Sequence, residues 1–426
     1  MSKSIFNPNR RSVLLGAAGA AAAASLPLPA FAQTRTIKIG YVSPNSGPLA
    51  LFGEADDFVL GSVRESFGAG IDIGGTVYPV EIIPKDTQSS VNRAAEVTNE
   101  LIVNDQVDLL LVSSTPETVN PVSDQCELNG TPCISTVAPW QAWLFGRGSN
   151  PEQGFESTFH FFWGLEDIAS VFTTMWDSID TNKTVGALFP NDEDGKAWAD
   201  EVNGFPALVK DRYNIVPSGF YRDLTDDFSS IITTFKNSNC EILAGVPIPP
   251  DFTTFWTQAN QQGFKPKAAS IAKAILFPAA VEALGDAGHN LSSEIWWSPS
   301  HPFKSSLTGQ SASDYAKAYT EATGRQWTQP IGFAHALFEL ASDVFKRAGG
   351  PGDPAKTIAA IADTSIDTIV GKVDWKNTPI KNVSKTPLVG GQWRRTPDGP
   401  YKYDLVVTTN GTAPEIPATG TFEILS

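Results

Sequence analysis

The sequence lacks the short signatures of the common nucleotide-binding and hydrolytic enzymes. It contains no GxGxxG or GxxxxGK-S/T phosphate loop, no GxSxG nucleophile elbow and no HExxH zinc motif. Histidine is also rare, with four residues at positions 160, 289, 301 and 335, and their spacing suits no metal site. The sequence therefore predicts a protein that is not an enzyme and carries neither a metal nor a cofactor.

Basic residues are outnumbered by acidic ones. The chain has 31 Lys and Arg against 46 Asp and Glu, which gives a formal net charge of −15. An acidic surface repels nucleic acids and anionic membranes, so we exclude both as partners. With 426 residues the chain is too long for one small core and suits two domains of ordinary size.

An alanine-rich apolar stretch at the N-terminus predicts export. It follows the paired arginines Arg10 and Arg11 and ends in the small-x-small sequence Ala30–Ala32, as in a twin-arginine signal peptide. Two prolines near its end and the cleavage site directly after it argue against a membrane anchor, and no lipobox cysteine is present. We expect a periplasmic mature chain from about Gln33. Its net charge would be −18, because segment 1–32 carries three basic residues and no acid.

Cysteine is scarce, with three residues at positions 126, 133 and 240. Between Cys126 and Cys133 an Asn129-Gly130 turn would bring a helix end back to the start of a strand. In an oxidising compartment this arrangement predicts a Cys126–Cys133 disulfide, with Cys240 left as a buried free thiol. The spacing is neither CxxC nor metal-like, which argues against a redox role.

Apolar strands and amphipathic helices alternate along the mature chain. The expected strands of the first half include Val107–Val112, a continuous apolar run typical of a parallel strand covered on both faces. After residue 166 the alternation restarts, with a helix expected over Lys196–Val209. The predicted fold class is therefore α/β, with two doubly wound parallel sheets. The other strands expected in the first half are Ile37–Val42, Val77–Pro84 and Pro132–Thr136.

The two runs predict two lobes with a cleft between them. After the signal segment 1–32, we assign residues 33–160 plus about 299–375 to the first lobe. The second lobe takes about 161–298 plus 376–426, the latter including a C-terminal extension. A long amphipathic helix within "PIGFAHALFELASDVFKRAGG" is expected to pack back on the first lobe, so the chain would cross the hinge more than once.

Polar loops follow the carboxyl ends of the expected strands, and in open α/β sheets this edge binds ligands. Helix N-termini behind such loops offer free amide groups to a carboxylate, although the same residues could serve only as helix caps. The loops are Ser43–Phe52, Ser113–Glu117, Ser135–Trp143, Pro190–Gly195 and Val246–Asp251.

Several segments, in order along the mature chain, resemble the leucine/isoleucine/valine-type periplasmic solute-binding proteins. They are "IKIGYVSPNSGPLALFGE", "ELIVNDQVDLLLVSSTPETVNPVSD", "PCISTVAPW", "GALFPNDEDGKAW", "TQANQQGFKPK" and "DTIVGKVDW". The resemblance implies a type I periplasmic-binding fold, in which two Rossmann-like lobes joined by a multi-strand hinge close on a ligand. It also implies a partner, the permease subunits of an ABC transporter.

The same resemblance implies a set of ligand-binding positions. An aromatic residue that leans over the ligand matches Phe52, and a carboxylate-binding serine region matches Ser113, Ser114 and Thr115. The family's contacts from the next strand end match Thr136, Val137 and Ala138. Its contacts from the second lobe match Asp194 and Ile248.

Two positions depart from the family pattern. Asp194 stands where the family has an aromatic residue, and the segment "ASIAKAILFP" offers Lys273 where the family has an acid for an ammonium group. Asp194 could supply that acid instead, or the ligand could have no ammonium. Lys273 itself could contact the ligand or be a solvated surface residue.

Tryptophans cluster near the expected cleft. Trp140 follows a cleft loop, Trp163 follows the first crossing between lobes, and Trp296 and Trp327 lie near later crossings. Aromatic walls suit an aromatic ring, a sugar-like ring or an alkylated ammonium, although many of these side chains could belong to the core.

Together these features predict a monomeric periplasmic receptor of an ABC importer. It would capture a small polar solute, an amino acid or a related compound, by lobe closure. An alternative is a sensory ligand-binding protein of the same fold that feeds a signalling partner. A secreted hydrolase is disfavoured, because the sequence shows no paired base and nucleophile.

Overall fold

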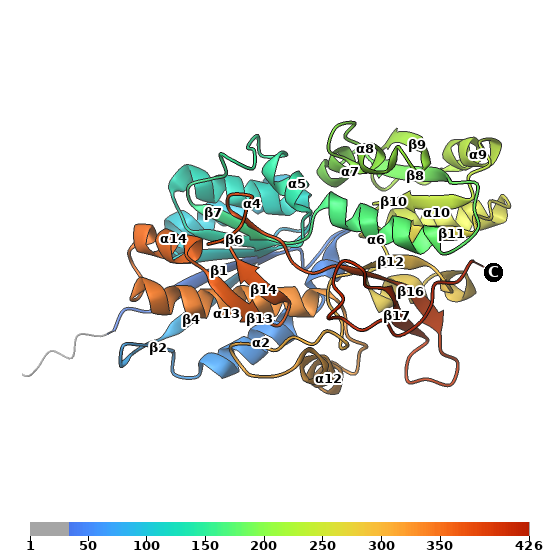
Figure 1. The fold of residues 1–426 in the computed structure, drawn as a ribbon. Coiled ribbons are helices and arrows are strands. Elements are labelled where there is room, and N and C mark those ends of the chain that lie inside the picture. Colours follow the sequence, from blue (N-terminus) through green and yellow to red (C-terminus); the bar gives the residue numbers. More distant parts are fainter. Residues whose placement is uncertain (1–33, 426) are drawn as a thin grey trace, which may run out of the picture. The chain divides into compact units, whose positions relative to one another are not determined.

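The computed structural model describes residues 34–425, and residues 36–425 belong to one compact unit. The predicted signal peptide at 1–32 lies outside the described residues. Within 34–425, no helix combines the length and the apolar character needed to cross a membrane. Strands and helices alternate as expected and build two large sheets (Figure 1).

The first sheet is parallel throughout, in the order β15-β7-β6-β5-β1-β4. Every residue of β5, β6 and β7 is buried, as expected for parallel strands covered on both faces. The strands are β1 (Ile37–Ser43), β4 (Val80–Asp86), β5 (Leu109–Ser113), β6 (Cys133–Thr136), β7 (Thr158–Phe161) and β15 (Val383–Ser384).

Alternate side chains of these strands enter two different cores. Ile39 and Leu111 pack with helices α2 (Asp56–Phe67) and α13 (Pro330–Ala348). Leu110 and Val112 pack instead with α3 (Val91–Asn99) and α4 (Pro116–Asn129). Successive side chains of a strand point to opposite faces, so helices cover both faces of the sheet.

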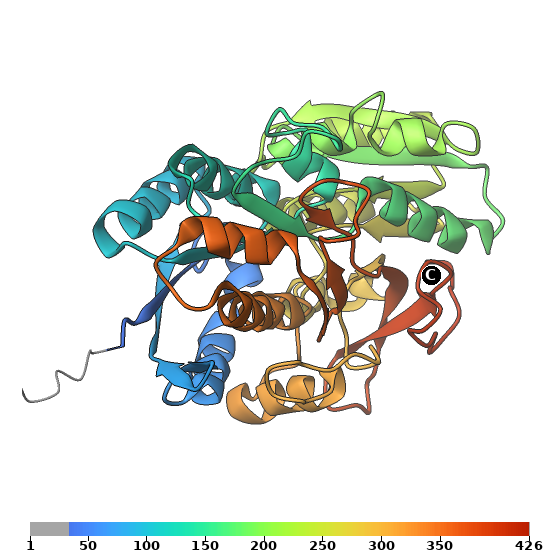
Figure 2. The ribbon, with the colours of Figure 1, turned by 60° about the vertical axis from the view of Figure 1, so that its left-hand side comes forward.

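The second sheet has the order β17-β16-β12-β11-β10-β8-β9. Strands β8 to β12 run parallel, while β16 and β17 add an antiparallel edge (Figure 2). The strands are β8 (Thr184–Pro190), β9 (Asn214–Tyr221), β10 (Ile242–Gly245), β11 (Ala268–Ile271), β12 (Ser292–Ile295), β16 (Val389–Arg395) and β17 (Tyr403–Thr409). Two mainly parallel sheets covered by helices confirm the predicted fold class.

The chain passes between the two sheets three times: after β7, after β12 and after β15. Helix α13 follows the second passage and packs on α2, β5 and β6, as expected for a segment that returns to the first lobe. Strand β15 also pairs in the first sheet, although its residues fall in the segment 376–426 that the sequence assigned to the second lobe.

The expected helix over Lys196–Val209 is two short helices, α7 (Glu193–Trp198) and α8 (Phe205–Val209). A turn separates them, and Gly204 sits in it so tightly that a Cβ atom would lie 2.4 Å from the Asp200 carbonyl oxygen. Pro206 then favours a new helix start, because its missing N–H costs nothing in the first turn. The helical pattern was correct, but the break within it was not foreseen.

The remaining elements connect and cover the sheets. The other helices are α5 (Trp140–Leu144), α6 (Leu165–Asp177), α9 (Ser229–Asn237), α10 (Pro249–Gln261), α11 (Pro278–Glu282), α12 (Ala312–Thr323) and α14 (Pro354–Ala362), with short helical segments η1 (Ala50–Gly53), η2 (Glu100–Asp105) and η3 (Gly285–Gly288). Two hairpins are formed by β2 (Ile71–Ile73) with β3 (Thr76–Tyr78), and by β13 (Ser365–Thr368) with β14 (Gly371–Asp374).

All three cysteines are buried free thiols in the structure, so the predicted disulfide is not formed in it. Cys126 of α4 and Cys133 of β6 nevertheless interact. Burial, and next the hydrogen bond with Cys133, raise the pKa of the Cys126 thiol well above its usual value. A protonated thiol is a poor nucleophile, so the pair will not react quickly by itself.

Because the two sulfurs already interact, we expect that an oxidant can join Cys126 and Cys133 in the folded protein. A closed loop this short would raise the free energy of unfolding by roughly 2–3 kcal/mol. Chemical unfolding with and without reductant, together with mass analysis after alkylation, measures this. Equal unfolding midpoints and three alkylated cysteines under oxidising conditions would refute the bridge.

Candidate functional site

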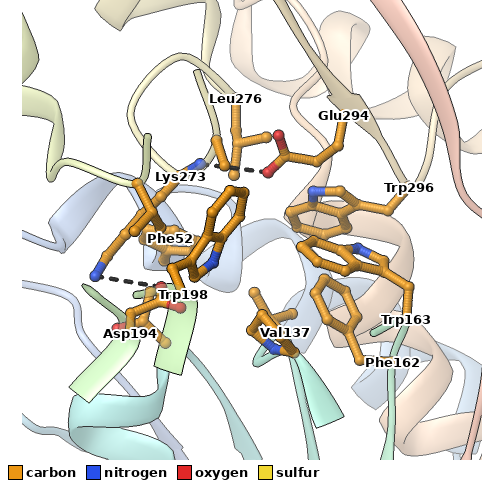
Figure 3. A pocket seen from close by; sticks show the side chains of 14 residues that line it. Phe52, Val137, Phe162, Trp163, Asp194, Trp198, Lys273, Leu276, Glu294 and Trp296 are labelled. Atoms are coloured by element: carbon orange, nitrogen blue, oxygen red, sulfur yellow. Dashed lines mark hydrogen bonds and ion pairs between the residues drawn. The ribbon is translucent and has the colours of Figure 1, made fainter. Parts of the chain in front are cut away.

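A small cavity lies where strand ends of the two sheets meet (Figure 3). Phe52, Thr115 and Val137 reach it from segments that follow β1, β5 and β6 of the first sheet. Asp194 and Lys273 reach it from segments that follow β8 and β11 of the second sheet. Loops at the carboxyl ends of parallel strands therefore supply both sides of the cavity, as expected for a ligand site in an open α/β sheet.

The cavity has a volume of about 300 Å³, part of which is open to solvent. Two residues on its walls have backbone angles that L-amino acids rarely adopt: φ is +72° at Val137 and +63° at Lys273. Such strain is uncommon for a β-branched residue and is often found at functional sites. Val137 follows a strand of the first sheet, and Lys273 follows a strand of the second sheet.

The apolar walls are mainly aromatic. Phe162 packs against Trp163 with 4.7 Å between ring centroids and against Trp296 at 5.3 Å. Phe52 packs edge-on against Phe277, with 4.9 Å between ring centroids. Trp198 lies across the cavity from Trp163 and Trp296 (Figure 3). These rings present both flat faces and indole N–H groups to the small space that they enclose.

One corner of the cavity holds a buried ion cluster centred on Lys273. Its Nζ lies 2.9 Å from Glu117 Oε1, 2.9 Å from Asp192 Oδ2 and 3.4 Å from Asp194 Oδ2. Only 4% of Lys273 is exposed, so the alternative of a solvated surface lysine is wrong. An ammonium group has three N–H donors, and here three carboxylates surround it.

Charge and burial compete at each member of this cluster. Burial alone would lower the pKa of Lys273, but the carboxylates together hold it well above its usual value. Burial would raise the pKa of Glu117, but Lys273 lowers it to about 2. At Asp194 burial outweighs Lys273 and raises the pKa to about 7. Lys273 and Glu117 are therefore charged near neutrality, while Asp194 is close to half ionised.

A fourth acid, Glu294 of β12, lines the opposite part of the cavity. Its carboxyl accepts hydrogen bonds from Ser293 Oγ at 2.8 Å and from the backbone N–H of Lys273 at 3.3 Å. Burial raises its pKa to about 8. Glu294 is therefore largely protonated at neutral pH, and an approaching charge can change that.

Several polar atoms at the cavity have no hydrogen-bond partner within the protein. They are the indole Nε1 of Trp163, Trp198 and Trp296 and the Oδ1 atom of Asp194. Buried polar atoms are almost always paired, because an unpaired one costs roughly 1–3 kcal/mol. These four atoms lie at one place and can pair with a bound molecule or with ordered water.

Polar contacts join the two sides next to the cavity. Besides the Glu117–Lys273 ion pair, the backbone N–H of Asp194 donates to Glu117 Oε1 at 3.3 Å, and Asn120 Nδ2 donates to Glu193 Oε2 at 2.9 Å. Helices α4 and α7 therefore meet through charged and polar side chains, which can separate into water more easily than an apolar interface.

Five of the positions expected at the ligand line this cavity: Phe52, Thr115, Val137, Asp194 and Lys273. The others are turned into neighbouring structure. Thr136 Oγ1 donates to the Phe161 carbonyl at 2.6 Å, and Ser114 Oγ accepts from Thr118 at 2.6 Å. The positions that the structure does not bring to the cavity walls are Ser113, Ser114, Thr136, Ala138, Trp140, Ile248 and Trp327.

Two tryptophans among the expected positions that do not line the cavity have other partners. Trp140 Nε1 donates to Glu166 Oε1 at 3.0 Å, and Trp327 packs edge-on against Trp297 at 6.2 Å. Trp198 and Glu294 reach the cavity without having been expected there. Trp198 lies only a few residues after the polar loop that follows β8, and this position could have indicated that it lines the cavity. Glu294 lies within β12, and no sequence feature distinguishes it from an acidic residue in an ordinary strand.

Residues 36–394 match the family model described as "Periplasmic binding protein". This match covers most of the chain, and the chain belongs to that family. It confirms the resemblance seen in the sequence. The members of the family are solute-binding proteins, and the cavity described above lies between the two sheets as the ligand site of such a fold would.

Solved structures of similar fold come from several bacteria. A leucine-binding protein of Thermotoga maritima has a TM-score of 0.72 at 17% identity, covering 88% of this chain and 99% of its own. A branched-chain amino acid transporter substrate-binding protein of Streptococcus pneumoniae, in complex with isoleucine, has 0.68 at 17%, covering 88% and 100%.

A third similar structure is a solute-binding protein of an ABC transporter from Rhodopseudomonas palustris BisB5, in complex with 3,4-dihydroxy benzoic acid. Its TM-score is 0.68 at 17% identity, with 89% of this chain and 99% of its own covered. At such low identity these structures establish the type I fold alone. Their ligands differ from one another, so the fold does not determine which solute is bound.

Proposed function

We propose that this protein is the exported substrate-binding component of an ABC importer, and that it captures a small polar organic solute without catalysis. One observation carries the proposal. A buried cavity has walls from both sheets, and unpaired polar atoms such as Trp163 Nε1 and Asp194 Oδ1 line it. A solute that pairs with these atoms would hold the two sides together.

Closure of two lobes on a ligand would bring groups from both sheets to the solute. Ligand contacts that exist only when the lobes are shut shift the equilibrium toward the shut form. The Glu117–Lys273 pair already joins the two sides at 2.9 Å, so part of the closing interaction lies in the protein itself. The permease would then receive the shut, loaded form.

A ligand screen on the mature protein tests the proposal. Amino acids, aromatic acids, amides, polyols and amines should each be followed by thermal shift and by tryptophan fluorescence, because indoles of Trp163, Trp198 and Trp296 line the cavity. A true ligand raises the melting temperature, changes the emission and reduces the radius of gyration in scattering. If no solute produces these effects, the proposal fails.

Phe52→Ala should weaken binding of the solute found in the screen by about tenfold or more, because buried aromatic contacts commonly contribute over 1 kcal/mol. Phe52 is only 4% exposed and packs on Phe277 at the cavity wall. Phe220→Ala is the matched control, since that ring is 57% exposed on β9. Titration calorimetry compares the two variants, and equal affinities would place the solute elsewhere.

A further inference from the structure

The cavity and its ion cluster carry an excess of acid. Glu117, Asp192, Asp194 and Glu294 contribute four carboxyl groups, whereas Lys273 is the sole basic side chain on the described cavity wall. The Lys273 ammonium donates to Glu117 and Asp192 at 2.9 Å and forms an ion pair with Asp194 at 3.4 Å. No positive group is therefore free to receive the carboxylate of an amino acid or of an aromatic acid.

The two helix starts next to the cavity are also occupied by acids. Helix amides at an N-terminus attract anions, but α4 carries Glu117 in its first turn and α7 carries Glu193 and Asp194 there. Asp192 caps α7 by accepting from the Gly195 N–H at 2.6 Å. A ligand carboxylate at either position would meet a like charge.

Unpaired atoms point to what the cavity accepts instead. Asp194 is 3% exposed and its Oδ1 lacks a partner, so it can take an N–H or O–H group or lie against a cation. The indole N–H groups of Trp163, Trp198 and Trp296 need an acceptor, and an uncharged oxygen meets that need. The ring faces around them attract cations, most strongly at tryptophan.

From these contacts we propose that the solute is a small organic cation, an amine or alkylated ammonium that bears an uncharged oxygen and no carboxylate. The inference rests on the proposed function and defines the substrate class of the same cavity. The ammonium lies against the aromatic faces near Asp194, and the oxygen accepts from the indole N–H groups. Its charge favours the ionised forms of Asp194 and Glu294, whose carboxyl groups burial otherwise keeps partly or largely protonated.

Matched compounds distinguish a cationic solute from a carboxylate-bearing or an uncharged one. Choline and glycine betaine share a trimethylammonium and differ in a hydroxyl against a carboxylate. 3,3-Dimethyl-1-butanol has the shape of choline without its charge, and ethanolamine against glycine repeats the comparison for a primary amine. In calorimetry with the mature protein we expect the hydroxylated cation of at least one series to bind about 100-fold more tightly than its carboxylate counterpart. We expect the uncharged analogue of choline to bind no better than glycine betaine.

Asp194→Asn tests the assigned residue, because it keeps the side chain's size and removes its charge. We expect at least a tenfold loss of affinity for the cation that binds, while Asp226→Asn, at an exposed position, leaves the affinity unchanged. Thermal unfolding of both variants shows whether each is folded. An unchanged affinity in folded Asp194→Asn would overturn the assignment.

The two levels of the proposal fail in different ways. If leucine, a hydroxybenzoate, glycine betaine or an amide binds and the cations do not, the inferred class is overturned while solute binding stands. Equal affinity for choline and its uncharged analogue overturns it as well. If no compound in this set or in the wider screen binds, solute capture at this cavity is itself refuted.

Discussion

Lys273→Met should be strongly destabilising. The substitution removes the ammonium that Glu117, Asp192 and Asp194 surround at 2.9–3.4 Å and leaves acids buried without a counter-ion. Breaking a buried ion pair from one side costs roughly 3–5 kcal/mol. In a chain of this length that corresponds to a melting temperature lower by roughly 4–6 °C, which calorimetry or circular dichroism measures.

Lys317→Met is the matched control, because that side chain is 74% exposed in a pair with Glu321. Exposed ion pairs contribute little to the free energy of unfolding, so its melting temperature should stay close to that of the parent. The loss at Lys273 should be smaller at pH 5 than at pH 8, since protons can then neutralise the carboxyl groups left behind. Two variants with the same melting temperature would contradict the central place given to Lys273.

Glu294→Gln should flatten the fall of stability between about pH 5 and pH 8.5. Burial raises the pKa of this carboxyl from 4.5 to about 8, so the folded protein binds a proton that the unfolded chain has lost. Its contribution is therefore present at low pH and lost as pH rises through the folded pKa. Glutamine keeps the shape and cannot ionise, which removes that part of the slope.

The expected difference is several degrees in melting temperature at pH 8.5 and little at pH 5. Asp194, Asp56 and Glu339, each with a pKa raised by burial to about 7, keep some of the slope in both proteins. Glu65→Gln, at an exposed position, is the control and should follow the parent at every pH. Parallel pH curves for Glu294→Gln and the parent would show that Glu294 ionises freely in the folded state.

Much of the fold could be predicted because its signals are local. The apolar run Val107–Val112 overlaps β5 (Leu109–Ser113), and the long helical pattern near residue 330 corresponds to α13. The boundaries of individual helices and strands were predicted less accurately than their order. The turn at Gly204 divides an expected helix, because the close approach of the Asp200 carbonyl is a contact that helical periodicity does not report.

Part of the cavity lining could be predicted from the sequence, as loops at strand ends. Phe52, Thr115 and Val137 follow strands of the first sheet and line the cavity, since every parallel strand presents its carboxyl end at the same edge. That they bind a ligand stays a prediction. Their neighbours Ser114 and Thr136 were not distinguished from them. Which residue of a loop faces the cavity depends on local backbone angles, such as the φ of +72° at Val137, and these angles do not follow from residue type.

The alternation of strands and helices, the acidic balance and the loops after the strand ends could be predicted from the amino-acid sequence, because each depends on nearby residues or on composition. The role of Lys273 depends on how remote segments fold together. Its partner Glu117 lies 156 positions away, and Asp192 lies 81 away. Whether a lysine is solvated or is the counter-ion of buried carboxylates depends on the distances and the exclusion of water that folding creates between remote segments.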